Sequence, residues 1–127
     1  MAQPQIWLGF ELAVAVHAEQ LAIHGGRKGV RDPGLLRAAI ARPRNLAQYG
    51  KHDLADLAAG YAYAIVRNHA FLDGNAGTAA LLSEFFLTMN GTSLTASDAE
   101  LAVAFLELAD GELSEEELAD WFREHLA

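Results

Sequence analysis

Cysteine is absent from the 127-residue sequence, which excludes a disulfide framework, a thiolate metal site and a cysteine nucleophile. Positive charge is scarce, because 9 Lys and Arg against 17 Asp and Glu give a formal net charge of −8. That balance argues against broad binding to the phosphate backbone of nucleic acid. No apolar run reaches the roughly 20 residues of a membrane span, and the start MAQPQIW has no basic signal segment. We therefore expect a cytoplasmic protein.

Apolar residues dominate what is present. They make up 52% of the sequence and charged residues 20%, which excludes intrinsic disorder. The length suits one domain of ordinary size with its own hydrophobic core. We therefore predict a single domain spanning residues 1–127.

Apolar residues recur at helical spacing through nearly the whole sequence, and strand signals are weak. Expected helices cover residues 8–23, 32–41, 53–68, 76–89, 97–109 and 114–126. Asp32 is predicted to cap the second helix, Pro33 to open it and Pro43 to end it. Ser97 with Glu100, and Ser114 with Glu117, have the spacing of capping boxes.

The helix expected over residues 76–89 is apolar on every side, which is typical of the centre of a bundle. The sequence therefore predicts an all-α fold, a single compact bundle of about six helices with a buried central helix.

Residues 69–78, HAFLDGNAGT, are the strongest candidate for a functional site. They form a loop that enters a helix, and a helix N-terminus presents unpaired N–H groups that favour phosphate. Gly74 and Gly77 let the backbone approach an anion closely. Asp73 supplies a hard oxygen ligand suited to Mg²⁺, and His69 is placed to act as a general base.

The same residues also have a purely structural interpretation. A histidine beside a helix end is usually a surface or capping residue. Asp73-Gly74 is a common turn, and Asn75 is a common N-cap. Spacing alone leaves both interpretations open.

The pattern H-A-F-L-D-G-N, followed by T-A, resembles the Fic/Doc family motif, which reads H-x-F-x-D-(A/G)-N-K-R-T-A in the Doc branch. The similarity extends upstream, where residues 24–26, 29–36 and 41–43 resemble death-on-curing toxins. It covers most of the chain, roughly from His17 to His125.

The resemblance implies a small helical domain that transfers part of a nucleoside triphosphate, with Mg²⁺, to a protein hydroxyl. Doc toxins transfer phosphate from ATP or another nucleoside triphosphate to a threonine of elongation factor Tu, which arrests translation. Fic proteins usually transfer AMP instead. Upstream similarity favours the Doc activity, with AMP transfer as the alternative.

Carried over by position, the resemblance assigns roles to individual residues. It implies catalytic roles for His69, Asp73 and Asn75, a metal-binding role for Asp73, a core anchor in Phe71, and nucleotide contacts from Arg67, Gly74, Asn75, Ala76, Gly77 and Thr78.

One departure from the family pattern is serious. Ala76-Gly77 stands where the Doc pattern has Lys-Arg. Such basic side chains clamp the transferring phosphates, and losing them costs orders of magnitude in rate. We therefore expect an enzyme of this family whose turnover is impaired. The change is either natural, leaving a catalytically dead binding partner of an antitoxin, or a deliberate detoxifying substitution.

The loop over residues 25–31 holds three of the nine positive charges, Arg27, Lys28 and Arg31. In the family this stretch forms a flap where a target segment docks, although an ordinary polar loop is equally consistent with the residues. The resemblance also implies a Phd-like antitoxin, whose C-terminal segment folds as a helix in a groove of the toxin. The inhibitory helix that some Fic proteins carry in cis is not found, so inhibition in trans is expected.

Overall fold

The computed structural model describes residues 5–127 and contains six α-helices within them. They are α1 (Phe10–His24), α2 (Pro33–Gln48), α3 (Leu54–Asn68), α4 (Asn75–Met89), α5 (Asp98–Ala109) and α6 (Glu115–Glu124). The predicted all-α class and the expected number of helices are confirmed. None of the helices in residues 5–127 combines the length and apolar character needed to cross a membrane.

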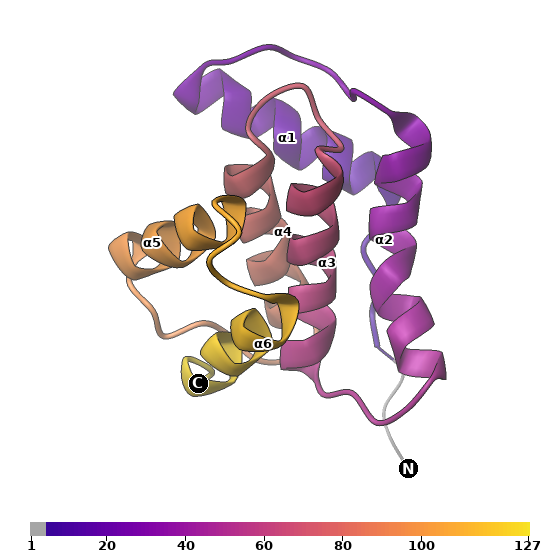
Figure 1. The fold of residues 1–127 in the computed structure, drawn as a ribbon, viewed down its shortest axis with the longest axis vertical. Helices are drawn as coiled ribbons and strands as arrows, with labels where there is room; N and C mark the ends of the chain where they lie inside the picture. Colours follow the sequence, from indigo (N-terminus) through magenta and orange to yellow (C-terminus); the bar gives the residue numbers. More distant parts are fainter. Residues whose placement is uncertain (1–4) are drawn as a thin grey trace.

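Helix α3 lies at the centre of the bundle, with α2, α4, α5 and α6 packed around it and α1 crossing one end (Figure 1). Ten of its 15 residues are buried. A buried central helix is thus present, but it is α3, and the assignment of that position to residues 76–89 is wrong. In α4 the side chains of Phe85 and Met89 are partly exposed.

Helix α2 continues through Pro43 to Gln48, so the predicted end at Pro43 is wrong. Proline removes one backbone hydrogen bond and usually ends or kinks a helix. Here Pro43 is buried against Gly60 of α3, where an added Cβ would lie 3.5 Å from Pro43 Cγ and 3.1 Å from Leu46 Cδ1. This close packing with α3 offsets the missing hydrogen bond.

The predicted caps are confirmed. Asp32 accepts a hydrogen bond from the N–H of Leu35 and precedes Pro33, the first residue of α2. Both capping boxes, at Ser97 and at Ser114, are complete.

Two further helix ends differ from the prediction by two residues each. The first helix begins at Phe10, because Leu8 lies in an extended lead-in whose N–H donates to the Tyr61 hydroxyl at 3.0 Å. The last helix ends at Glu124, and Leu126 pairs in an isolated bridge instead.

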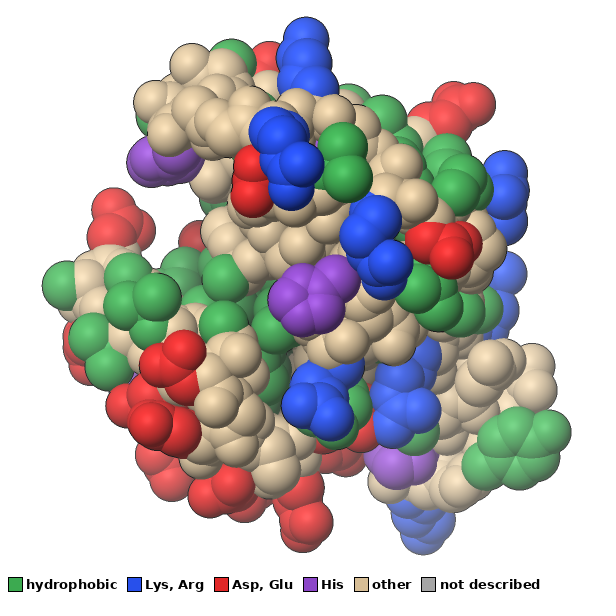
Figure 2. Space-filling model, turned by 45° about the horizontal axis from the view of Figure 1, so that its top comes forward, with side chains coloured by type: hydrophobic (Ala, Val, Ile, Leu, Met, Phe, Trp, Pro, Cys, Tyr) green, Lys and Arg blue, Asp and Glu red, His purple; other side chains and the backbone are tan. Residues whose placement is uncertain are grey.

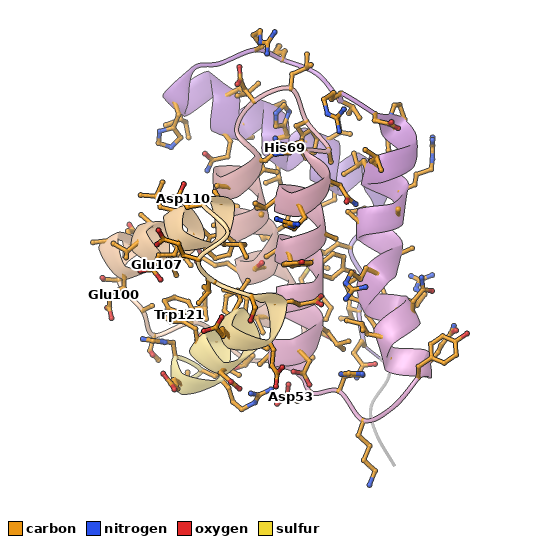
Figure 3. All side chains as sticks on the ribbon, viewed as in Figure 1. Asp53, His69, Glu100, Glu107, Asp110 and Trp121 are labelled. Carbon is orange, nitrogen blue, oxygen red and sulfur yellow. The ribbon has the colours of Figure 1, made fainter. Side chains whose placement is uncertain are left out.

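Arg123 joins α6 to the start of α3. Its guanidinium lies 2.7 Å from Asp53, 2.9 Å from Asp56 and 2.6 Å from Asp120. Because the guanidinium donates hydrogen bonds to the Asp53 carboxylate, the pKa of Asp53 lies below its ordinary value. This network stands at the end of α3 opposite to His69 (Figure 3).

Replacing Arg123 with Ala should therefore lower the stability of the fold. The groups are partly exposed, so we expect a loss of about 1 kcal/mol and a melting temperature lower by about 4 °C. A lowered carboxyl pKa stabilises the folded state above the unfolded pKa and ceases to do so as the pH falls. The difference between the two proteins should shrink as the pH drops below 3.8, the ordinary value for Asp53. Thermal melts from pH 7 to pH 3 measure both effects, and a constant difference would contradict the assignment.

Candidate functional site

His69 ends α3 in a left-handed backbone conformation, with φ at 46°. Among residues 5–127 it is the only residue other than glycine with positive φ. Such a conformation costs a non-glycine residue about 1 kcal/mol or more, and it persists only when its surroundings hold it. The imidazole is exposed at this end of the bundle (Figure 3).

Arg31 holds that strained end in place. Its Nε donates to the His69 carbonyl and its Nη2 to the Asn68 carbonyl, both at 2.6 Å. The last carbonyls of a helix carry partial negative charge, which a cation neutralises. Arg31, one of the predicted flap residues, therefore caps the end of α3, and its role in docking a target stays a prediction.

The flap, residues 25–31, pairs with the loop that follows His69. The N–H of Arg31 donates to the Ala70 carbonyl at 2.9 Å, and the N–H of Leu72 donates to the Gly29 carbonyl at 3.1 Å. Val30 and Phe71 thereby form an isolated antiparallel bridge. The flap thus lies directly against the candidate loop (Figure 1).

Phe71 is fully buried, in keeping with the anchoring role expected of it. Its ring stacks on His17 of α1, with centroids 3.9 Å apart and planes at 8°. His17 Nε2 lies 2.8 Å from the Asp73 carbonyl oxygen. A carbonyl only accepts, so Nε2 carries the proton and donates. His17 is itself only 3% exposed.

Asp73 faces the flap. Its Oδ2 accepts the backbone N–H of Arg27 at 2.8 Å and lies 3.5 Å from Arg27 Nε. Gly26, with φ at 123°, allows this approach, since an added Cβ would lie 3.2 Å from Asp73 Cβ and 3.0 Å from Leu21 Cδ2. The carboxylate is therefore held by the flap while its side chain remains 45% exposed.

Gly74, with φ at 72°, occupies the N-cap position of α4. The N-cap that the structural interpretation assigned to Asn75 is thus taken by glycine. The Asn75 side chain turns back and makes two bonds with Phe71, accepting from its N–H and donating to its carbonyl, both at 2.9 Å. The side chain of Asn75 therefore closes the loop on itself.

The first turn of α4 carries no charged side chain, because Asn75, Ala76, Gly77 and Thr78 are all neutral. Its N–H groups have no partners within the helix and project from its end. Gln20 of α1 covers Gly77, where an added Cβ would lie 2.9 Å from Gln20 Oε1. Thr78 Oγ1 is buried and has no hydrogen-bond partner within the described part of the chain.

The structure does not bring every predicted residue to the same place. Arg67 is exposed, with its guanidinium 5.9 Å from the Tyr63 ring centroid, and it lines a groove between α2 and α3. Its predicted contact with nucleotide stays a prediction. Figure 2 shows Lys and Arg side chains spread across this face of the molecule around an exposed histidine, while acidic side chains gather towards α5 and α6.

A metal ion bound at Asp73 would need further ligands from the nucleotide substrate. No group of three or more ligating side chains occurs within residues 5–127. Asp73 supplies one hard oxygen, and Mg²⁺ commonly takes one or two carboxylates together with substrate phosphates and water. The donor set therefore fits Mg²⁺ only when nucleotide phosphates accompany it.

Sequence reasoning missed His17 and Gln20. His17 belongs to no motif in the sequence, since it lies seven residues from His24, too far along a helix for the two to share a metal ion. His17 lies four residues from both Ala13 and Leu21, which places it on the buried face of α1. That spacing is the sequence signal that could have identified it. The contact between Gln20 and Gly77 depends on how α1 crosses α4, and no local pattern indicates that.

Replacing His17 with Phe should preserve the stack on Phe71 and remove the donor to the Asp73 carbonyl. An unpaired buried acceptor costs about 1–3 kcal/mol. This bond is only partly buried, so we expect a loss towards the lower end, seen as a lower melting temperature and faster amide exchange over residues 72–75. His17→Gln can restore an N–H donor at a similar reach and should recover part of both effects. Calorimetry and hydrogen-exchange mass spectrometry measure them. Exchange in His17→Phe equal to that of the parent would contradict this role.

Comparison with known proteins agrees with the geometry. The model of the Fic/DOC family matches residues 7–87. The chain is 35% identical over 114 residues to "Protein kinase doc" of Escherichia phage P1, covering 89% of this chain and 90% of that protein. It is 45% identical over 75 residues to "Toxin Doc" of Mycolicibacterium smegmatis, covering 57% of each. The chain therefore belongs to the Fic/DOC family and is similar over most of its length to Doc toxins.

Proposed function

We propose that this protein is a Doc-like toxin that transfers phosphate from a nucleoside triphosphate to a Ser or Thr hydroxyl of a translation factor, elongation factor Tu. The observation that carries the proposal is the position of His69. Its imidazole is exposed at a strained turn, one short loop before Asp73 and the uncharged N-terminus of α4. A base, a hard oxygen ligand and an anion-binding helix end are thus contributed by one segment.

The chemistry needs few groups. The target hydroxyl oxygen attacks the γ-phosphorus while its proton passes to the His69 imidazole, which acts as general base. An oxygen–phosphorus bond forms, the bond from the γ-phosphorus to its bridging oxygen breaks, and the nucleoside diphosphate leaves. The N–H groups at the start of α4 stabilise negative charge on the phosphates. Magnesium, held by Asp73 with the phosphates, would neutralise further charge.

The uncharged Ala76-Gly77 pair should make this transfer slow. Transferring phosphates carry developing charge that cations stabilise most strongly, and α4 offers only backbone N–H groups there. AMP transfer of the Fic type remains the alternative reaction, because Ala76-Gly77 replaces the residues that best distinguish the Doc branch from the Fic branch. A catalytically dead partner of an antitoxin is the alternative from another functional class.

A groove beside the site suits a helical antitoxin segment. It has a volume of about 510 Å³ and lies between α1, α4 and α5. Leu81, Leu101 and Phe105 are among its apolar lining residues, and Gly77 of the candidate site also lines it. Burial, with Asp98 nearby, raises the pKa of Glu84 in this groove. We propose that a Phd-like antitoxin inserts its C-terminal helix here and covers the end of α4.

The double variant Ala76→Lys, Gly77→Arg tests the reaction. Gln20 Oε1 must move aside for Arg at 77, which a flexible side-chain end allows. Incubated with elongation factor Tu and γ-labelled or α-labelled ATP in parallel, the variant should transfer the γ label. Adding His69→Ala to it should abolish transfer without changing the circular dichroism spectrum.

Other results would redirect the assignment. Transfer of the α label would establish AMP transfer. A folded variant that transfers neither label would favour the binding-partner alternative. Transfer that survives His69→Ala would remove His69 as the base.

Leu106→Glu tests the groove. Leu106 is 62% exposed on its rim, so the substitution should leave the fold intact and weaken binding of a Phd-like antitoxin by about tenfold or more. Val103→Glu is a matched control, because Val103 is 55% exposed on the same helix but lies outside this groove. Equal affinities of the two variants in isothermal titration calorimetry would place the antitoxin elsewhere.

A further inference from the structure

Arg27 is the cation held beside the candidate phosphate site. Its Nε lies 3.5 Å from Asp73 Oδ2, and its backbone N–H donates to the same oxygen. Its side chain is 75% exposed, so the guanidinium retains donors that face solvent. Two hydrogen bonds between the flap and the 70–72 segment keep this part of the chain against the loop.

The start of α4 itself supplies no cation. A nucleoside triphosphate brings several negative charges, while Asn75, Ala76 and Gly77 contribute only backbone N–H groups. The space beside Gly77 is filled by Gln20, whose amide is neutral. Arg31, the other arginine of the flap, is committed to two backbone carbonyls at the end of α3.

We propose that Arg27 binds the nucleotide phosphates in place of the cations that α4 lacks, and so is a phosphate-binding residue of this site. In the free protein its charge is balanced by Asp73. With nucleotide bound, Asp73 would hold Mg²⁺, and the Arg27 guanidinium would exchange the carboxylate for phosphate oxygens. The backbone bond from the Arg27 N–H and the flap pairing hold the residue in place during this exchange.

The exchange is energetically easy. An exposed ion pair contributes little to stability, because water screens it and long side chains lose freedom in forming it. A planar guanidinium matches the paired oxygens of phosphate. Arginine therefore gains more from the phosphates than it loses at Asp73, and the flap takes part in nucleotide binding as well as any target docking.

The inference rests on the proposed function, and binding of Mg·ATP without target protein tests it. Isothermal titration calorimetry should give a dissociation constant for Arg27→Ala that is larger than the parent's by about tenfold or more. Lys28→Ala removes the same formal charge one residue along the flap and should change the constant by about threefold or less. Arg27→Lys should fall between parent and Arg27→Ala, because it keeps the charge without the planar fork. Circular dichroism and melting temperatures confirm that each variant is folded.

The protein carrying Ala76→Lys and Gly77→Arg separates the two hypotheses. If it binds Mg·ATP and the parent chain does not, the compensation by Arg27 is wrong and the proposed function stands. If the parent and Arg27→Ala bind Mg·ATP equally well, the specific role of Arg27 is overturned. It is also overturned if Lys28→Ala loses as much affinity as Arg27→Ala. If neither protein binds Mg·ATP, both the inference and the proposed function fail.

Discussion

Burial of the Phe71 ring is the interaction on which the site depends. The ring stacks on His17 of α1, its backbone is bonded at both ends by Asn75, and its bridge with Val30 fixes the flap. Phe71, through its ring and its backbone together, thus joins α1, the flap and the start of α4. His69 and Asp73 lie two residues to either side of the buried Phe71, His69 exposed and Asp73 half-buried.

Two helix ends of opposite polarity meet at this loop. The negative end of α3 is neutralised by Arg31, which donates to its last carbonyls. The positive end of α4 has no charged side chain in its first turn. The local dipoles therefore favour an anion, on a protein whose net charge is −8. Arg42 pairs with Glu115 of α6, and Arg123 of α6 pairs with Asp53, so neither arginine contributes to this site.

The sequence predicted most of the helices because their signals are local. Asp32, Ser97 and Ser114 cap by contacts three residues away, and apolar periodicity marks the buried faces. Residues 69–78 stand out for the same reason, through glycines, a histidine and an aspartate in one loop. The predicted helix end at Pro43 was wrong because the helix continues where Pro43 packs against Gly60, which is 17 residues further along the chain. His17, Gln20 and the contact of Arg27 with Asp73 depend equally on distant parts of the chain coming together, and no local pattern contains them.

We propose that the end of α4, Asp73 and His69 together form one site for nucleotide phosphates. A crystal structure of the unaltered chain with Mg²⁺ and a non-hydrolysable ATP analogue tests it most directly. We expect phosphates on the N–H groups at the start of α4, Mg²⁺ on Asp73, and the Arg27 guanidinium moved from Asp73 to a phosphate. An analogue bound away from residues 69–78, or none bound at saturating concentration, would contradict it.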